Sequence, residues 1–328
     1  MANIRRPRKG SMQFWPRARA KKETPVVKNW ATSKNVNILG FVGYKAGMTH
    51  VQLKDNRAGS PSKGDIVNWP VTVVECPSIK LLSIRFYANS DYGENLVAEV
   101  FNPKLDKELA GRICLPNNYN FEEKMKNAEA KLADVSDVTI NVYTQPKKTG
   151  FGKKRPEVLE MAIGGNDAKA KLTFAKTLLD KEVRVSDVLK QGVKIDVHSV
   201  TKGKGFQGVI KRFGIALRNH KAEKGQRRMI YGPLRPARIT WGMHMPGKMG
   251  YHTRTEYNKG LVLISDKPER VNPKGGFLHY GLVKNDFVLV HGSIGGPTKR
   301  LVRLTEPIRG AQSMGNVELQ FISQESKQ

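Results

Sequence analysis

Short hydrophobic runs separated by glycine, proline, asparagine and serine set the pattern of the chain from residue 36 onward. Residues 36–45 (VNILGFVGYK), 71–76 (VTVVEC) and 81–87 (LLSIRFY) are rich in Val, Ile and aromatic residues, a composition typical of β-strands. We expect these three runs to begin a small antiparallel barrel. Comparable runs follow at 137–144, 157–163, 192–200, 260–264, 285–290 and 300–304. The pattern therefore predicts a mostly β protein.

Two segments between these runs have a helical pattern instead. Residues 121–133 (FEEKMKNAEAKLA) have helical composition and follow Asn118 and Asn120, which suit a helix N-cap. Residues 166–181 carry apolar side chains at helical spacing. The side chains on that face are Leu172, Ala175, Leu178 and Leu179. The mixture of helices and strands indicates an inserted α+β unit.

The expected architecture is a small closed β-barrel that is interrupted by two inserted segments. The barrel body is predicted at 36–84 and 186–328, and the α+β insertion at 85–185. A long basic loop at 201–260 forms the second excursion. Residues 1–35 are expected to be an extended basic arm, because prolines interrupt any helical periodicity there.

The composition of the 201–260 segment indicates what kind of partner the protein binds. It holds fourteen Lys and Arg, ten glycines and only two acids, Glu223 and Glu256. A segment with so much charge of one sign repels itself and does not compact without a polyanion. It is also too long for an ordinary loop, which favours a functional role. The polyanion that matches such a segment is a nucleic-acid backbone.

The charge of the whole chain supports this interpretation. The 328 residues carry a formal net charge of +28. Residues 1–28 hold nine basic residues against one acid, whereas residues 85–200 are nearly neutral with nineteen against seventeen. No apolar run approaches the ~18–20 residues of a spanning helix, and no secretory or lipidation signal is evident. We therefore expect nucleic acid, and no membrane, as the partner.

Neither the cysteines nor the histidines indicate a catalytic or metal site. Cys76 and Cys114 form no CxxC pair and are expected to be reduced thiols in a cytosolic protein. His244 and His252 lie in an Arg- and Gly-rich stretch without a Cys or acid cluster, so RNA hydrogen bonding fits them better than a metal. We expect no enzyme activity, no metal and no cofactor.

Residues 203–208 (GKGFQG) spell the G-x-G-x-x-G pattern of dinucleotide-binding folds. We expect a strand rather than a helix at 209–213, and Glu223 is the only acid within reach of the ~20-residue offset of a ribose partner. Lysines and an arginine flank the glycines instead. The pattern therefore favours glycines that let the backbone approach a phosphate closely.

Aromatic residues alternate with the charges of the arm. Phe14, Trp15 and Trp30 have two interpretations that the sequence leaves open. They pack on the protein's own core, or at least one of them lies against RNA bases or riboses.

Several dispersed motifs, in order, resemble one known family. Within 189–212 the matching residues are Leu189, Asp196, Ser199, Thr201, Gly203, Lys204, Gly205, Gly208 and Arg212. Further motifs are 7–11 (PRKGS), 16–18 (PRA), 250–258 (GYHTRTEYN), 275–277 (GGF), 280–281 (YG), Lys284, 292–293 (GS), 296–297 (GP) and 299–303 (KRLVR). The chain resembles the universal large-subunit ribosomal protein three family, in its archaeal and eukaryotic form, over nearly its whole length.

The resemblance implies a barrel of the translation-protein type and a structural, non-enzymatic role in the large subunit of the cytoplasmic ribosome. It implies early assembly and a basic loop extending towards the peptidyl transferase centre. Large-subunit rRNA, neighbouring ribosomal proteins and translation factors are the expected partners, and the protein is not expected to form a homo-oligomer. Two rivals stay open: an RNA-modifying enzyme with a basic groove, and a general nucleic-acid-compacting protein.

The residues expected at the RNA follow from these charges and motifs. The candidates for rRNA contact are Arg5, Arg6, Arg8, Lys9, Arg17, Arg19, Lys202, Lys204, Lys211, Arg212, Arg218, His220, Arg227, Arg228, Arg235, Arg238, Trp241, His244, Lys248, His252, Arg254, Lys299 and Arg300. Gly203, Gly205 and Gly208 are expected to approach the RNA backbone, and Gly232, Pro233 and Leu234 to form the loop tip. Many relatives place Trp where this chain has Leu234, and Lys221 occupies the position at which some relatives modify a histidine.

Overall fold

The structure is a computed structural model, and its described residues form two compact units. It describes residues 8–57, 59–114, 119–215, 238–310, 313–315 and 317–326. Unit 1 combines Met1–Lys22 with Val200–Thr253, and unit 2 combines Glu23–Ser199 with Arg254–Gln328. The two basic segments of the sequence therefore share a unit, although most of the chain separates them.

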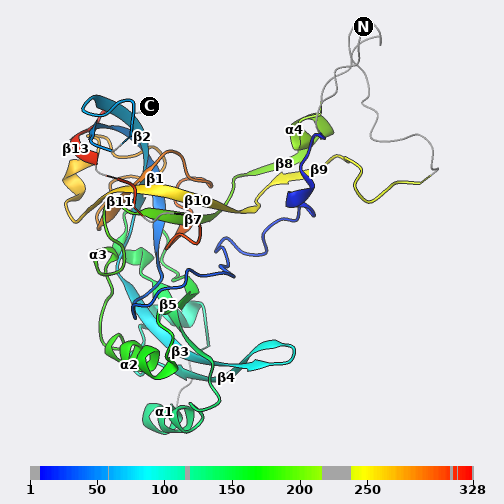
Figure 1. Ribbon diagram of the computed structural model, residues 1–328, viewed down its shortest axis with the longest axis vertical. Coiled ribbons are helices and arrows are strands. Elements are labelled where there is room, and N and C mark those ends of the chain that lie inside the picture. The colour runs from blue at the N-terminus through cyan, green and yellow to red at the C-terminus, as the bar shows by residue number, and fades with distance from the viewer. Residues whose placement is uncertain are drawn as a thin grey trace, which may run out of the picture. The chain divides into compact units, whose positions relative to one another are not determined.

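Strands dominate unit 2, as the sequence predicted (Figure 1). Its strands are β1 Gly40–Asp55, β2 Ile66–Glu75, β3 Ile79–Ser90, β4 Gly93–Phe101, β5 Asp137–Thr144, β6 Val158–Ala162, β7 Lys194–Val200, β10 Thr253–Ser265, β11 Phe287–His291, β12 Leu301–Thr305 and β13 Val317–Ile322. Its helices are α1 Phe121–Ala130, α2 Ala168–Thr177 and α3 Val185–Val188, with short 3-10 turns at Lys107–Gly111, Pro146–Lys148 and Pro268–Arg270.

Seven strands form the larger sheet. Their order is β12-β7-β10-β11-β2-β1-β13, and β12 also pairs with β1. That extra pairing links six strands into a closed circuit of hydrogen-bonded neighbours. Strand β1 makes this possible by its length, because residues 40–44 pair with β12 and residues 44–54 pair with β2.

The second sheet has four strands, in the order β4-β3-β5-β6, with α1 against β4 and α2 against β5. We expected the run 81–87 to belong with the barrel strands, and this was wrong. Strand β3 pairs with β4 and β5 instead, so the boundary expected between residues 84 and 85 falls inside a strand. A run of hydrophobic residues predicts a strand but does not say which sheet the strand joins.

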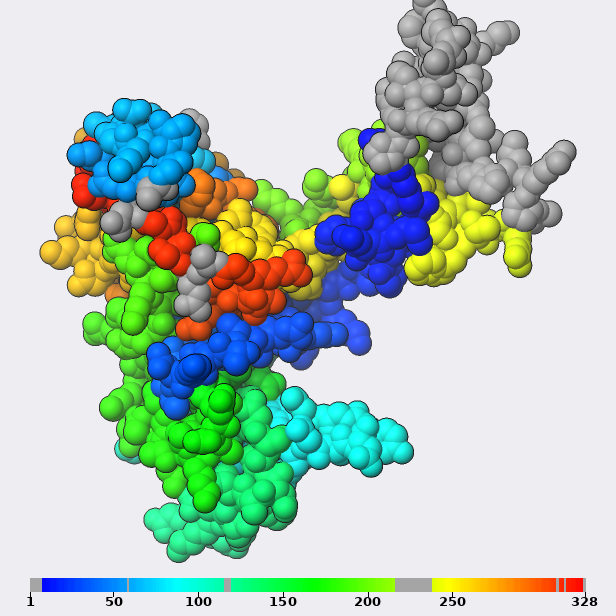
Figure 2. Space-filling model, viewed as in Figure 1, coloured from blue at the N-terminus to red at the C-terminus, as the bar shows by residue number. Residues whose placement is uncertain are grey.

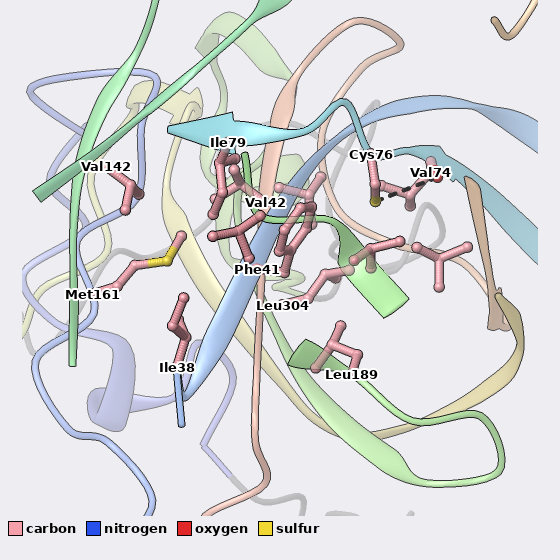
Figure 3. Close-up of a cluster of buried hydrophobic side chains, with 14 of the residues drawn as sticks. Ile38, Phe41, Val42, Val74, Cys76, Ile79, Val142, Met161, Leu189 and Leu304 are labelled. Carbon is pink, nitrogen blue, oxygen red and sulfur yellow. Dashed lines mark hydrogen bonds between the residues drawn. The ribbon is translucent and has the colours of Figure 1, made fainter. Parts of the chain in front are cut away.

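The two sheets of unit 2 share one hydrophobic core (Figure 3). Phe41 on β1 and Leu304 on β12 come from the larger sheet, while Val142 on β5 and Met161 on β6 come from the smaller one. All four side chains are at most 2% exposed. The α+β part is therefore packed onto the larger sheet rather than tethered to it.

A buried polar cluster joins the same two sheets. The Tyr44 hydroxyl lies 2.9 Å from Thr144 Oγ1 and donates to Glu157 Oε2 at 3.1 Å. Burial, together with the Glu157 carboxylate, raises the pKa of Tyr44 well above its ordinary value. The phenol therefore stays protonated and remains a donor. These bonds satisfy polar groups that would be costly to bury alone.

A buried arginine fastens the chain just before β1. Arg303 on β12 donates to the Pro25 carbonyl at 3.1 Å and to the Glu160 carbonyl, and its guanidinium lies 5.3 Å from the Trp30 ring centroid. Burial lowers the pKa of Arg303 to about 10. Trp30 also packs against the core, so of its two open interpretations the structure supports packing on the protein.

Most other element predictions were confirmed. The helices expected at 121–133 and 166–181 are present in shortened form, with Leu172, Ala175 and Leu178 buried. Strands β4 and β13 were not predicted. Their burial is low, with residues 93–96 exposed on β4 and alternate exposed residues on β13, so neither forms a continuous hydrophobic run. Among the described residues, no helix is both long and apolar enough to cross a membrane.

A substitution at Gly43 on β1 can test how closely the strands of the larger sheet are packed. A Cβ added there would lie 2.5 Å from Val74 Cγ1 and 2.7 Å from the Glu75 carbonyl oxygen. We expect Gly43→Ala to lower the free energy of unfolding by about 1–3 kcal/mol, because packed strands cannot move apart without loss. Gly111→Ala is the control, since no described atom outside its chain neighbours lies within 4 Å of that Cβ. Urea denaturation of the full chain measures both, and equal stabilities would contradict the prediction.

His198 on β7 gives unit 2 a pH-dependent stability. Its Nδ1 lies 2.9 Å from Thr255 Oγ1 and its Nε2 lies 3.1 Å from Thr305 Oγ1. Burial, and then the charge of Arg303, lowers the pKa of His198 to about 4.

Between pH ~6.5 and ~4, His198 is protonated in the unfolded chain but stays neutral in the folded chain. The free energy of unfolding should therefore fall as the pH drops through this window, by at most about 3 kcal/mol. His198→Gln should remove that part of the pH dependence. Denaturation at several pH values measures it, and an unchanged profile in the variant would refute the assignment.

Candidate nucleic-acid interface

A two-stranded hairpin forms the base of the long basic segment in unit 1. Strands β8 Gly203–Gln207 and β9 Gly247–Gly250 pair antiparallel, with Phe206 opposite Lys248. The ladder continues below them, where the Tyr251 amide donates to the Lys202 carbonyl at 3.2 Å. The segment expected to be a long basic loop therefore has paired strands at both of its ends.

One glycine makes this close pairing possible. Gly250 has φ +79°, and a Cβ at this position would lie 2.1 Å from the Lys202 carbonyl oxygen. Only glycine accepts both the left-handed backbone and the contact. Gly203 and Gly205 lie on the opposite strand, and Gly208 follows it directly. Outside their chain neighbours, no described atom lies within 4 Å of a Cβ added at any of these three glycines. Their backbone is open to a partner.

A short helix follows the hairpin, where a strand was predicted. Helix α4 spans Val209–Phe213, so the prediction of a strand at 209–213 was wrong. Val209 and Phe213 are buried, four residues apart on one face, and Gly214 ends the helix in the left-handed conformation with φ 67°. A helix therefore does follow the glycine motif. It is only five residues long, and the strand before it pairs in a hairpin rather than in the parallel unit of dinucleotide folds.

An aromatic cluster attaches the N-terminal segment to this helix. Trp15, just after the 3-10 turn Met12–Phe14, stacks on Phe213 with ring centroids 5.7 Å apart and planes 23° apart. Trp241 lies 5.5 Å from Trp15, and His244 lies 4.7 Å from Phe213. Figure 2 shows the blue N-terminal residues packed against the yellow residues that follow 238. For Trp15 the structure therefore supports packing on the protein, whereas Phe14 is 52% exposed.

Backbone hydrogen bonds extend the attachment along the N-terminal segment. The Ala20 amide donates to the Tyr251 carbonyl at 2.8 Å, and His252 Nδ1 donates to the Ala18 carbonyl at 2.8 Å. Arg8 Nη2 donates to the Gly242 carbonyl at 2.8 Å. His252 is 8% exposed, so its imidazole serves this internal bond. Residues 8–22 of the predicted arm thus belong to the same unit as the basic segment, whereas residues 23–35 belong to unit 2.

Two arginine side chains donate hydrogen bonds to backbone carbonyls within unit 1. Arg17 Nη1 donates to the Arg212 carbonyl at 3.2 Å, and Arg212 Nη1 donates to the Met245 carbonyl at 2.8 Å. Both guanidiniums lie near the Phe213 ring, at 4.6 Å for Arg17 and 5.1 Å for Arg212. These contacts hold two positive charges close together, an arrangement that an external anion would stabilise.

The charge of unit 1 is entirely of one sign where the structure describes it. Residues 8–22, 200–215 and 238–253 contain twelve Lys and Arg and no Asp or Glu. The exposed ones are Arg8, Lys9, Arg19, Lys21, Lys22, Lys202, Lys204, Lys211, Arg238 and Lys248. No carboxylate of this unit is available in the described ranges to neutralise them.

His244 is a neutral group within this positive field. Burial, and then the charge of Arg8, lowers the pKa of His244. Its ring therefore stays uncharged near pH 7 and does not add to the repulsion. Across the part of the chain that the structure describes, no group of three His, Cys, Asp or Glu residues could hold a metal ion.

The predicted site residues divide into three groups. Arg5, Arg6, Arg218, His220, Arg227, Arg228, Gly232, Pro233, Leu234 and Arg235 lie outside the described residues. Arg254, Lys299 and Arg300 belong to unit 2, where Arg300 lies 3.6 Å from Glu23. The others lie in unit 1, which brings them together from its N-terminal segment and from residues 200–253.

Sequence reasoning missed three exposed groups on this unit. Phe206 on β8 is 71% exposed, and Lys21 and Lys22 extend the row of cations in the N-terminal segment. An aromatic residue inside a glycine-rich strand was a usable signal for Phe206, because such a strand offers little core for it to pack against.

Comparisons with known proteins agree over the whole chain. A family model described as "Ribosomal protein L3" matches residues 1–328. A protein from Methanobrevibacter smithii is 44% identical over 100% of this chain and 99% of its own length, and one from Archaeoglobus fulgidus is 44% identical over 98% of each chain. A third, from Methanocaldococcus jannaschii, is 41% identical over 99% of this chain and 98% of its own. Each of these relatives is named "Large ribosomal subunit protein uL3".

Trp15 should determine whether the N-terminal segment stays attached. We expect Trp15→Ala to speed tryptic cleavage after Arg17 and Arg19 about ten-fold or more. A loss of about 1.4 kcal/mol of local stability is enough to raise the open population by that factor. Trp15→Phe keeps a stacking ring and should stay close to the wild type. Limited proteolysis followed by mass spectrometry measures the rates, and equal cleavage of Trp15→Ala and wild type would show that the stack is not needed.

Proposed function

Since the chain belongs to the ribosomal protein L3 family, a family of structural rather than enzymatic ribosomal proteins, we propose that in the large ribosomal subunit it binds rRNA chiefly through unit 1. The observation that carries this proposal is the set of twelve cations without a carboxylate on the described part of that unit. Such a surface binds a phosphate backbone and repels itself otherwise.

Cations and open glycines have complementary roles in this proposal. Lys202, Lys204 and Lys248 on the hairpin supply point charges, whereas an arginine such as Arg238 can grip a phosphate with two parallel hydrogen bonds. The uncrowded backbone at Gly203, Gly205 and Gly208 can approach phosphate oxygens closely. These contacts position the protein without reading the base sequence.

The remaining roles follow from the family and are proposed together. The closed circuit of six strands supports a barrel body of the translation-protein type, into which the α+β part is inserted. The basic segment would extend towards the peptidyl transferase centre, with its tip at Gly232, Pro233 and Leu234. Neighbouring ribosomal proteins and translation factors are the proposed further partners, and the protein would join the rRNA early in assembly as a single copy.

Salt dependence tests the proposal directly. We substitute Lys202, Lys204, Lys211 and Lys248 by Ala together and measure binding of the full chain to large-subunit rRNA from ~50 to ~200 mM salt. Each lysine that contacts phosphate should lower the slope of log affinity against log salt by about 0.7–0.9. The matched control replaces Lys124, Lys126, Lys131 and Lys169 of the α+β part, which are also exposed. The control has the same net charge, so an equal effect of both quadruple variants would argue against a specific interface.

A competition titration separates the proposal from general compaction of nucleic acid. At one fixed salt concentration, large-subunit rRNA should compete for the full chain much better than duplex DNA of equal phosphate content, because folded RNA offers shape as well as charge. Equal competition by the two would favour the compaction role instead.

A further inference from the structure

A pocket opens in unit 1 beside the aromatic cluster. Its volume is about 470 Å³, within the ~300–1,000 Å³ range of pockets that hold small ligands. Its lining comes from the N-terminal segment, from α4 and from the chain after residue 238. The lining includes Trp15, Arg17, Arg212, Phe213, Ile239, Trp241 and Met245.

The wall of this pocket is apolar and aromatic, unlike the cationic surface of the unit. Trp241 is 70% exposed and Ile239 is 67% exposed, although both are large hydrophobic residues. Met245 is 39% exposed in the same wall. Apolar side chains that gather at a concave surface mark an interaction site more often than isolated ones do. Trp241 also rests on Trp15 at 5.5 Å, which leaves its indole partly supported and largely accessible.

The positive charge around the pocket indicates which kind of ligand it can bind. Arg17 and Arg212 belong to the lining itself, and no acid exists in the described ranges of unit 1. A ligand that combines a flat aromatic surface with negative charge fits such a site. A nucleotide of a folded RNA has both, because its base stacks on aromatic rings while its phosphate meets the guanidiniums. An apolar protein segment would satisfy the wall and leave the cations without a counter-charge.

We propose that this pocket receives one unpaired nucleobase of the rRNA, stacked on the indole of Trp241, with its phosphate near Arg17 and Arg212. The inference rests on the proposed function and adds a base contact to a surface otherwise suited to phosphates. Base stacking at this site would also explain why Trp241, a member of the aromatic cluster, is largely exposed. Trp15 and Phe213 line the pocket as the less exposed rings, and Trp241 presents the stacking face.

The test compares three variants of the full chain with the wild type in binding to large-subunit rRNA. Trp241→Ala should weaken binding about ten-fold, the usual effect of losing one base stack. The slope of log affinity against log salt should stay unchanged, because no phosphate contact is removed. Trp241→Phe retains an aromatic ring and should bind nearly as wild type does. Tyr92→Ala, at a fully exposed aromatic residue of unit 2, is the control for losing an aromatic side chain elsewhere.

Chemical probing of the bases supplies a second, independent measurement. Wild type and Trp241→Phe should protect one unpaired base that becomes reactive again in the complex with Trp241→Ala. Unchanged affinity of Trp241→Ala, a changed salt slope, or the absence of such a base would each overturn the proposal. The lysine quadruple variant separates this result from the proposed function, since its lowered salt slope does not depend on any base contact.

Discussion

Unbalanced positive charge is the constraint on which unit 1 depends. Its described residues bring twelve cations together without one carboxylate, so ion pairs cannot hold them. Aromatic stacking and backbone hydrogen bonds hold the unit instead, because neither needs an opposite charge. Trp15 on Phe213 and the bond between Ala20 and Tyr251 are the clearest examples. Even His244 is kept neutral in this surrounding, which avoids one further positive charge.

Unit 2, in contrast, contains many carboxylates that pair with its cations, and a hydrophobic core stabilises it. Its α+β part is nearly neutral and pairs its charges on its own surface, as Lys80 with Asp106 and Lys104 with Asp180 do. Such exposed or half-exposed pairs add little stability, but they leave little net field to attract a phosphate backbone. Stability in this unit comes from the shared hydrophobic core and from buried polar contacts such as Tyr44 with Glu157. Net positive charge is therefore concentrated in unit 1, whereas the α+β part of unit 2 is nearly neutral.

The sequence predicted the elements far better than their partners. Runs with a clear hydrophobic pattern, such as 137–144, became strands with the same bounds. Five residues at 209–213 were too few for periodicity to separate strand from helix, and the flanking Gly214, which stops the helix, was the better signal. The contact of Trp15 with Phe213 joins distant parts of the chain, and no local pattern encodes it. For the same reason the cations could be named from the sequence, whereas the pocket beside them could not.

The connection of the hairpin to the larger sheet has a consequence for how this architecture can vary. The chain leaves the sheet at the end of β7 and returns at the start of β10, and these two strands are neighbours. The excursion therefore starts and finishes almost at one place. Doubling the length of a flexible closed excursion costs only about 0.6 kcal/mol of additional entropy. The number of residues between β7 and β10 can consequently change with little strain on the sheet, so the length of this excursion can evolve independently of the sheet.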